Sequence, residues 1–446
     1  MSSDARGALS SPSQIRSYAI AENASGGKTV SLIGGILRLQ YFESLLSDTV
    51  SSEILYIDTG GAIDGKTVLD GLPLVGGEKS KFIIEDNKET TLEIEVFANK
   101  ITPLSDNTHG QVVMISSVSK EFLLNDKIRL YEKFESKISE AVKKILTDAN
   151  YLGTEKDTTG VDDTFEEEYN FMGNSKKPFY TINWLSKKAV PATSGENSAS
   201  GNTAGFFFWE TSEGYHFKSI DSLLGQEPKK SIIYNDTPDD CGKKVPPGYD
   251  IKALSYTKNN IQSTNDKQKV GARDTRLITF NPFDGFYDVQ VPNSNATKDS
   301  LTTAGRELPT QNPELVRPGN KKNFSRTTYA LKDIGSLPSG TTGQQLEKAT
   351  EENFKVEKVL NQSIMRYNQF FSFKCEVVIP GDFSLHAGDA VYIDTPQQKD
   401  TNTEEFNEQS GGLYIISELC HYLDVNGTYT KLILVRDSVE RKPKTR

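Results

Sequence analysis

The chain has 446 residues, 35% of them hydrophobic, and 51 basic against 61 acidic side chains give it a net charge of −10. The sequence has no basic stripe that could neutralise phosphates, so this composition argues against a protein that binds nucleic acid through its phosphates. DNA can still pass an acidic surface without binding to it, because like charges repel. No stretch approaches the roughly 18 apolar residues of a membrane span, and the N-terminus lacks the apolar core of a signal peptide. The length predicts about two to four compact units.

Residues that form disulfides or bind metals are too scattered to make a recognisable site. The three cysteines and four histidines are Cys241, Cys375, Cys420, His109, His216, His386 and His421. No cysteine pair has CxxC spacing and no two histidines have metal-ligand spacing, so reduced thiols and structural histidines are expected. No nucleophile motif such as GxSxG occurs either. The sequence therefore predicts no catalytic, metal-binding or cofactor-binding residue.

The N-terminal part predicts an arm followed by a β domain. Residues 1–28 are rich in Ser, Ala and Gly, which predicts a flexible arm. From Ile33 onward the pattern becomes β. Leu92, Ile94 and Val96 alternate with glutamates, which is the period of a half-buried strand. Strand-like runs continue to residue 124, so residues 29–124 are expected to form a first β domain.

The middle of the chain, residues 125–291, predicts a mixed α+β unit. Asn125 or Asp126 can cap an amphipathic helix that runs to about Asn150, and Pro178 opens a shorter helix. The run 205–217, GFFFWETSEGYHF, is typical of two aromatic strands across a turn. Further short strands of this unit could complete a later β domain.

The C-terminal part predicts a loop-rich arm and then a second β domain. Residues 292–345 are rich in Asn, Thr, Ser, Gly and Pro, which predicts an extended loop or interaction arm. A helix over 346–370 leads into short strands with turn signals, among them Pro380-Gly381-Asp382 and the hairpin signal Asn426-Gly427. Residues 346–437 are thus expected to form a helix and a small barrel or sandwich, and residues 438–446 a basic tail.

The ordered pattern of the last strands resembles a known family. Its matching positions are Pro380, Gly381, Asp382, Leu385, Gly388, Asp389, Val391, Ser410, Gly411, Tyr414, Ile415, Ile416, His421, Tyr429, Leu432, Leu434, Arg436 and Asp437. They resemble the C-terminal barrel of the central baseplate hub of contractile-tailed, T-even-like phages, which is related to the hub part of VgrG spikes. A second match follows the aromatic hairpin, at Ser219, Ile220, Asp221 and Leu223.

The resemblance implies a fold, a place and a set of partners. The fold would be α+β and predominantly β, with two small tail-hub β-barrels, α+β insertions and long loops. Three copies would form a ring that connects the tail tube to a central spike, with genomic DNA passing through without specific binding. The implied partners are a spike or tail-lysozyme-type protein, the tail tube initiator protein and baseplate wedge proteins. The implied place is the virion baseplate, assembled in the host cytoplasm, with no enzymatic activity and no cofactor.

Two alternatives stay open at this point. One is the hub of a VgrG-like contractile secretion system, although the lack of a β-helix spike after Asp437 favours separate hub and spike chains. The other is a nucleotide-binding factor built on the segment Gly60–Thr67, which fits the phosphate-loop pattern GxxxxGKT. Such a loop needs a helix that starts at its Lys-Thr end, but Gly71 and Pro73 break any helix there within about two turns. The nucleotide alternative is therefore the less favoured.

Overall fold

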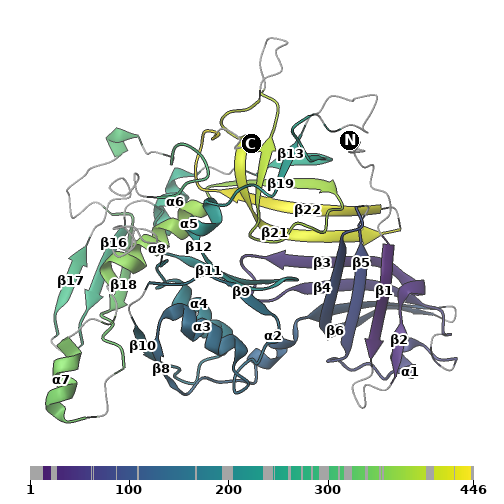
Figure 1. Cartoon of the computed structure of the whole chain (residues 1–446), viewed down its shortest axis with the longest axis horizontal. Coiled ribbons are helices and arrows are strands. Elements are labelled where there is room, and N and C mark those ends of the chain that lie inside the picture. Colours follow the sequence, from purple (N-terminus) through teal and green to yellow (C-terminus); the bar gives the residue numbers. More distant parts are fainter. Residues whose placement is uncertain are drawn as a thin grey trace.

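The computed structural model describes residues 14–442 except 22–27, 62, 64, 87, 108–109, 166–167, 193–203, 235–244, 246, 260–262, 273–274, 283–284, 291–300, 310–311, 316–323, 337–339, 351–352, 354–355, 398–405 and 426. Most of its regular structure is β-strand, which confirms the predicted predominantly β, α+β class. Figure 1 shows a first β region at one end, a second β region above it, a middle α+β unit below, and a small sheet at the opposite end.

One sheet runs through both β regions. Among the described residues it has 14 strands, and its first part is ordered β3-β4-β7-β6-β5-β1-β2. These strands are β1 (Gln14–Ala21), β2 (Thr29–Ser31), β3 (Ile36–Ser44), β4 (Ser51–Asp58), β5 (Lys79–Glu85), β6 (Thr91–Asn107) and β7 (Gly110–Val118). The half-buried period predicted for residues 92–96 is confirmed, because Leu92, Ile94 and Val96 are all buried in β6.

The N-terminal segment is not an arm throughout. Residues 14–21 form β1, which pairs with β5, and Tyr18 and Ile20 are buried in the first core. The ring of Tyr18 stacks on Phe82, with 5.3 Å between the ring centroids. The predicted arm over residues 1–28 is therefore wrong for β1, while residues 1–13 lie outside the described part. A strand with one buried face needs an apolar residue only at every second position. Two large apolar residues, Tyr18 and Ile20, are therefore enough to anchor β1, although the surrounding sequence is rich in Ser and Ala.

The second β region is built mainly from the C-terminal strands that the sequence predicted. Its strands are β13 (Lys230–Ile233), β14 (Ile251–Lys252), β15 (Ser255–Lys258), β19 (Phe373–Pro380), β20 (Ala390–Asp394), β21 (Gly412–Asp424) and β22 (Gly427–Arg436). β21 pairs with β20 and β22 and, through its second half, also with β3 of the first region. Figure 1 shows β21 and β22 lying over β3. The two β regions are therefore joined edge to edge.

The second region comes close to encircling its own core. β14 and β15 follow one another in the chain, yet β14 pairs with β13 and β15 pairs with β19. Between them, the Ala253 amide donates to the Ile233 carbonyl and the Leu254 amide to the Val378 carbonyl. Strand neighbours thus lead from β13 through β20, β21, β22 and β19 back to residues 251–258. In the first region the order of described strands ends at β2, so the prediction of two closed barrels is not confirmed.

The middle unit packs helices beneath a small sheet. Its elements are α2 (Lys120–Asn125), β8 (Lys133–Ser136), α3 (Ile138–Thr147), β9 (Asp157–Val161), β10 (Tyr169–Met172), α4 (Pro178–Ser186), β11 (Phe206–Thr211), β12 (Gly214–Ser219) and α5 (Ile220–Leu224). The predicted aromatic hairpin is confirmed as β11 and β12, and Pro178 begins α4 as predicted. The predicted helix from Asn125 to Asn150 is wrong, because Phe134 lies in β8 and stacks on Phe171 of β10. Of the residues that fit one helical stripe, Ile128 precedes β8, Phe134 lies in β8, and Ile138, Val142 and Ile145 lie in α3.

Residues 264–370 add a second small sheet and further helices. They form α6 (Thr264–Val270), β16 (Thr275–Phe280), β17 (Tyr287–Gln290), β18 (Arg326–Leu331), α7 (Thr342–Thr350) and α8 (Val356–Phe370). β16 pairs with β17 antiparallel and with β18 parallel. The loop predicted over 292–345 therefore contains a strand, and the helix predicted over 346–370 is two helices. β18 forms because β16, far earlier in the chain, supplies its hydrogen-bonding partner.

Among the described residues, four buried apolar clusters hold these parts together. Three of them belong to the first β region, the middle unit and the second β region, respectively. The fourth lies where the parts meet and includes Trp209 of the hairpin, Leu223 of α5, Phe370 of α8 and Ile415 of β21. Phe383, from the loop after β19, is buried in the core of the first region. Close packing in these shared cores fixes how the parts lie relative to one another.

We expect Ile20→Ala to lower the free energy of unfolding by about 2–5 kcal/mol, because it removes a fully buried side chain from the first core. Arg16→Ala on the same strand is the matched control, since Arg16 forms an exposed ion pair with Glu85 and such pairs contribute little. Denaturant unfolding followed by circular dichroism measures both variants. An unchanged unfolding midpoint for Ile20→Ala would show that β1 is not part of the folded core.

Candidate functional site

A buried polar junction joins three parts of the chain at Glu43 of β3. The Tyr41 hydroxyl and the Ser212 amide each donate to Glu43 Oε1 at 2.9 Å, and the Ala387 amide donates to Oε2 at 2.9 Å. His386 Nδ1 lies 3.2 Å from Oε1. Ser212 belongs to the turn of the aromatic hairpin, and His386 and Ala387 belong to the loop before β20. This Glu43 junction therefore connects the first β region, the middle unit and the second β region.

The charges of the Glu43 junction support one another. Burial alone would raise the pKa of Glu43, but His386 and the amides of Ser212 and Ala387 outweigh it and hold that pKa below its ordinary value of 4.5. Burial alone would lower the pKa of His386, but the hydrogen bond and charge of Glu43 outweigh it and hold that pKa above 6.5. Both shifts favour a buried ion pair at mildly acidic pH.

The aromatic hairpin is also packed into the loop that carries His386. Trp209 Nε1 donates to the Ala387 carbonyl at 2.9 Å. Gly388 has a φ of +92°, and a Cβ at this position would lie 2.4 Å from Trp209 Cζ2. The carboxylate of Asp389 accepts a hydrogen bond from the His386 amide at 2.8 Å. Gly388 and Asp389, two motif positions named from the sequence, thus shape the loop that receives the hairpin.

A second buried cluster is centred on Arg366 of α8. Its Nη2 donates to Asp221 Oδ1 at 2.6 Å and to the Thr302 carbonyl at 3.1 Å, and its Nη1 donates to Asp437 Oδ2 at 3.3 Å. Asp437 also accepts from the Ala304 amide at 3.1 Å. Burial raises the pKa of Asp221, and Arg366 offsets only part of that effect. The cluster ties α8 to α5 and to the end of β22 through Asp221 and Asp437, two positions of the hub resemblance.

The Pro380-Gly381-Asp382 motif ends β19 as predicted and reaches the first β region. Pro380 is the last residue of β19, and the Gly381 amide donates to the Thr428 carbonyl at 3.1 Å. The buried Asp382 carboxylate pairs with Lys88, between β5 and β6, at 3.0 Å. Burial alone would raise the pKa of Asp382, but the hydroxyl of Ser384 and the charge of Lys88 lower it. The motif therefore links the two β regions.

Three further motif positions gather around a fourth, the buried cation of Arg436. Arg436 is fully buried, and its Nη1 donates to the Gly411 carbonyl at 2.7 Å. Its guanidinium lies over the ring of Tyr414, 4.7 Å from the centroid. The Tyr414 hydroxyl in turn donates to the Ser410 carbonyl at 2.8 Å. These contacts hold the turn before β21 against the end of β22.

His421 is a packed histidine, as the sequence predicted. It is fully buried in β21, and its Nδ1 lies 3.0 Å from Thr430 Oγ1. Its ring stacks on Tyr41 of β3 and meets Phe383 edge-on. Burial lowers the pKa of His421 to about 4, so the ring is neutral near pH 7. His421 therefore packs the second β region against the first.

The glycine-rich segment after β4 does not form a phosphate loop. The carboxylate of Asp58 accepts hydrogen bonds from the Gly60 amide at 2.9 Å and from the Val68 amide at 2.5 Å. An internal anion thus holds one amide at each end of this segment. The helix that follows, α1 (Val68–Gly71), has four residues and is capped by Thr67. The nucleotide-binding alternative on Gly60–Thr67 is therefore not confirmed, because the described residues lack the long helix that such a loop needs after its Lys-Thr end.

In the part of the chain that the structure describes, no group of three or more His, Cys, Asp or Glu side chains could hold a metal ion. Cys375 and Cys420 are free thiols, and burial raises the pKa of Cys375 to about 12 and that of Cys420 to about 11. Cys241 and His109 lie outside the described residues. None of the described helices combines the length and apolar character of a membrane span.

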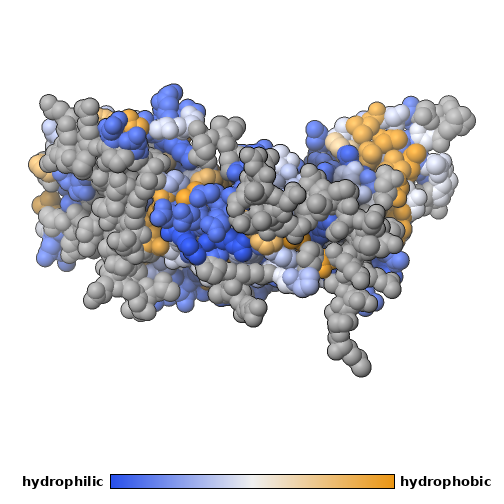
Figure 2. Space-filling model, turned by 90° about the horizontal axis from the view of Figure 1, so that it is seen from above, coloured by the Kyte–Doolittle hydropathy of each residue, from blue (hydrophilic) through white to orange (hydrophobic). Residues whose placement is uncertain are grey.

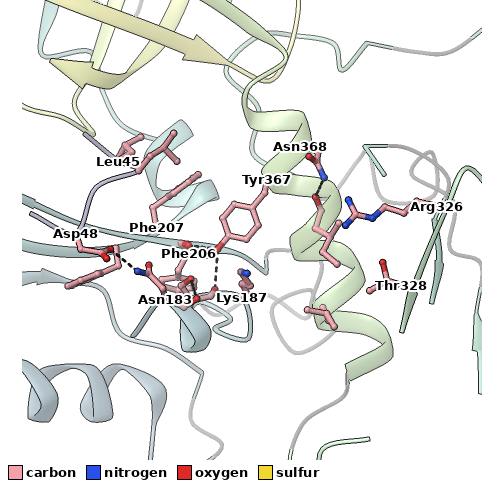
Figure 3. Close-up of a pocket in the computed structure, with 15 residues that line it drawn as sticks. Leu45, Asp48, Asn183, Lys187, Phe206, Phe207, Arg326, Thr328, Tyr367 and Asn368 are labelled. Atoms are coloured by element: carbon pink, nitrogen blue, oxygen red, sulfur yellow. Dashed lines mark hydrogen bonds between the residues drawn. The ribbon is translucent and has the colours of Figure 1, made fainter. Parts of the chain in front are cut away.

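A groove of about 660 Å³ lies between α8, β18 and the middle unit, and we call it the α8 groove. Its apolar lining consists of Leu45, Leu46, Phe206, Phe207, Phe208, Leu360, Ile364 and Tyr367. Figure 3 shows Asp48 and Asn183 on one side of Tyr367 and Arg326 and Thr328 on the other, with Lys187 between them. This groove combines an open apolar surface with charged side chains.

Sequence reasoning missed the centres of both buried clusters. A signal for Glu43 was present, because Leu39, Tyr41 and Glu43 share one face of β3 by their alternation and the first two are apolar. No comparable signal marks Arg366, since a single cation in a helix usually lies in solvent.

No family model matches the chain, and no curated protein matches its sequence. Solved structures, however, match its fold. The 43 kDa tail protein of prophage MuSo2 from Shewanella oneidensis has a TM-score of 0.51 and 10% identity, and the match covers 96% of this chain and 100% of that one. The chain has the fold of a phage tail protein. The tail protein from Neisseria meningitidis MC58 also matches, with a TM-score of 0.50, 10% identity and coverage of 94% and 97%.

The tail-protein fold spans nearly the whole length of this chain and of both solved proteins. Both β regions and the middle unit therefore belong to the shared fold. At the level of the fold, the resemblance to phage tail proteins that the sequence indicated is confirmed.

We expect His386→Gln to cost more stability near pH 6 than near pH 9. The pKa of His386 is raised in the folded protein, so its proton stabilises the fold below the ordinary pKa of 6.5, and this contribution is lost as the pH rises through the raised value. Urea unfolding of wild type and variant at both pH values measures the cost. Equal costs at both would contradict the buried ion pair.

His421→Gln is the control for that experiment and should behave in the opposite way. The pKa of His421 is lowered to about 4, so its contribution is complete above pH 6.5 and falls as the pH falls toward 4.

Arg366→Met should lower the free energy of unfolding by about 3–5 kcal/mol, because it leaves Asp221 and Asp437 buried without their cation. Adding Asp437→Asn should recover part of that loss by removing one uncompensated charge. Lys229→Met, which breaks a partly exposed ion pair with Asp389, is the control and should cost less than about 1 kcal/mol. Chemical unfolding compares the three variants. A cost for Arg366→Met no greater than the control's would show that the cluster does not stabilise the fold.

Proposed function

We propose that this protein is the structural hub of a contractile phage tail baseplate, in which three copies form a ring between the tail tube and the central spike. The observation that carries this proposal is the tail-protein fold, shared over 96% of the chain with the MuSo2 tail protein. The hub motif positions add support, because Asp221, Gly388 and Asp437 lie in buried contacts that join parts of the fold. The role is mechanical and needs no bond chemistry. The protein would act in the virion baseplate after assembly in the host cytoplasm.

The two β regions would be the ring-forming units. Residues 29–124, together with β1, would supply the first tail-hub barrel, and residues 346–437 the second, with β13, β14 and β15 of the middle residues completing it. The pairing of β13 with β20 and of β15 with β19 supports this assignment. The pairing of β21 with β3 holds the two units together, so three copies would place them alternately around a lumen.

An exposed apolar patch supports contact between subunits. Val425 is 78% exposed in the turn after β21, and Leu37 lies next to it because Arg38 pairs with Asp424. Ile33, just before β3, is also exposed. Figure 2 shows an apolar patch at the end of the molecule that the first β region occupies. Contiguous apolar surface of this kind often marks a protein contact.

The proposed partners follow from the place of a hub. A spike or tail-lysozyme-type protein would bind on one side of the ring, the tail tube initiator protein on the other, and baseplate wedge proteins outside. Genomic DNA would pass through the lumen without specific binding, and the net charge of −10 agrees with passage because like charges repel.

The mass of the purified chain in solution tests the ring. We expect a trimer, and we expect Val425→Glu to shift it toward monomer by burying a charge in the contact. Leu346→Glu is the control, because Leu346 is exposed on α7 at the opposite end of the molecule and should leave the trimer intact (Figure 1). Light scattering coupled to size-exclusion chromatography measures all three.

A density map of the tail particle then tests the place of the protein at the baseplate axis. A chain that stayed monomeric at high concentration and was absent from tail particles would refute the hub proposal. Recovery from a secretion apparatus in place of a tail would favour the VgrG-like alternative.

A further inference from the structure

The α8 groove is lined in part by an edge strand, β18. β18 pairs with β16 and with no other strand among the described residues. Two of its residues, Arg326 and Thr328, line the groove. An edge strand presents a row of backbone donors and acceptors to which an extended chain can add.

The apolar floor of the groove is preformed. Tyr367 reaches across from α8, and its hydroxyl accepts a hydrogen bond from the Phe206 amide at 3.0 Å. Phe207 packs against the ring of Tyr367 edge-on, with 5.2 Å between the centroids. Leu46 at the rim is 64% exposed, which leaves apolar surface uncovered beside this floor. The volume of about 660 Å³ suits a short segment of chain, since ligand sites span roughly 300–1,000 Å³.

The charges in the groove favour an acidic occupant. Lys187 and Arg326 both line it, and the one acidic lining residue, Asp48, already accepts a hydrogen bond from Asn183 at 2.7 Å. Arg326 donates to the Val270 carbonyl at 2.8 Å, which holds its guanidinium at the groove. Thr328 Oγ1 is buried there without a hydrogen-bond partner among the described residues. A carboxylate would complement the two cations.

We propose that the α8 groove binds an extended segment of another tail protein. The segment pairs with the edge of β18, places an apolar side chain against Leu46 and Phe207, and places an Asp or Glu side chain at Lys187 and Arg326. The inference rests on the proposed function only in taking the partner to be a component of the tail.

Photo-crosslinking in assembled tail particles tests this docking site. The full chain carries p-benzoylphenylalanine in place of Leu46, whose exposure makes the change compatible with folding. We expect a crosslink to one other tail protein, within a segment that has an acidic residue next to an apolar one. Lys187→Glu and Arg326→Glu should each reduce the crosslink yield by about tenfold, through the loss of one charged contact. Lys120→Glu on α2, an exposed charge reversal outside the groove, is the control and should leave the yield unchanged.

The outcomes separate this inference from the hub proposal. Absence of the protein from the particles would refute the hub. Presence in the particles without a crosslink from position 46, or with a crosslink only to a second copy of this chain, would overturn the docking site. A crosslink that persists undiminished in both charge-reversal variants would overturn the acidic partner. Thermal unfolding of each variant before assembly confirms that a lost crosslink does not reflect a misfolded chain.

Discussion

The relative arrangement of the two β regions and the middle unit depends on one buried carboxylate, that of Glu43. An ionised carboxylate taken out of water costs several kcal/mol unless hydrogen bonds and opposite charge replace its hydration. Here the replacement comes from three chain segments that are far apart in sequence: the neighbouring Tyr41 hydroxyl, the Ser212 amide, and the Ala387 amide with the ring of His386. If one segment moved away, the carboxylate would be left buried with unsatisfied acceptors. The junction therefore favours a single relative position of the three parts.

The Arg366 cluster applies the same constraint on the other side of the shared apolar core. Its two carboxylates belong to α5 and to the end of β22, so α8 cannot shift without separating a buried cation from its partners. Between the two clusters, Trp209 packs against Gly388 and leaves no room for a side chain there. The buried polar clusters specify how the parts lie relative to one another, and the shared apolar core supplies the buried apolar surface. Such contacts oppose relative movement of the parts, which would suit the proposed role of passing force between a tube and a spike.

The sequence predicts an element of this structure when the signal for it lies within the element itself, and fails when the element depends on a distant partner. The strands after residue 371 and the aromatic hairpin were predicted because alternation and turn residues such as Gly381 are local signals. The prediction of one long helix after Asn125 was wrong. Ile128, Phe134 and Ile138 fit a helical stripe, but Phe134 lies in a strand, where its ring stacks on Phe171. β18 was missed because its partner strand lies far away in the chain. The closure of the barrels was inferred from resemblance, and the pairing of β21 with β3 has no signature in either strand alone.

In the candidate site, too, local signals could be predicted from the sequence, whereas contacts between distant residues could not. The motif positions from Pro380 to Asp437 could be named from sequence, but their contacts could not, because each contact involves a residue from another region: Lys88 for Asp382, Trp209 for Gly388 and Arg366 for Asp437. A fold that persists at 10% identity over the full length of a solved tail protein must depend on few side chains. Buried charges whose partners lie on different parts meet that requirement, since a handful of them fixes the arrangement while the remaining surface is free to vary. The two proposed contact surfaces, the α8 groove and the turn at Val425, lie outside these clusters, so their side chains could change without disturbing the connection between the parts.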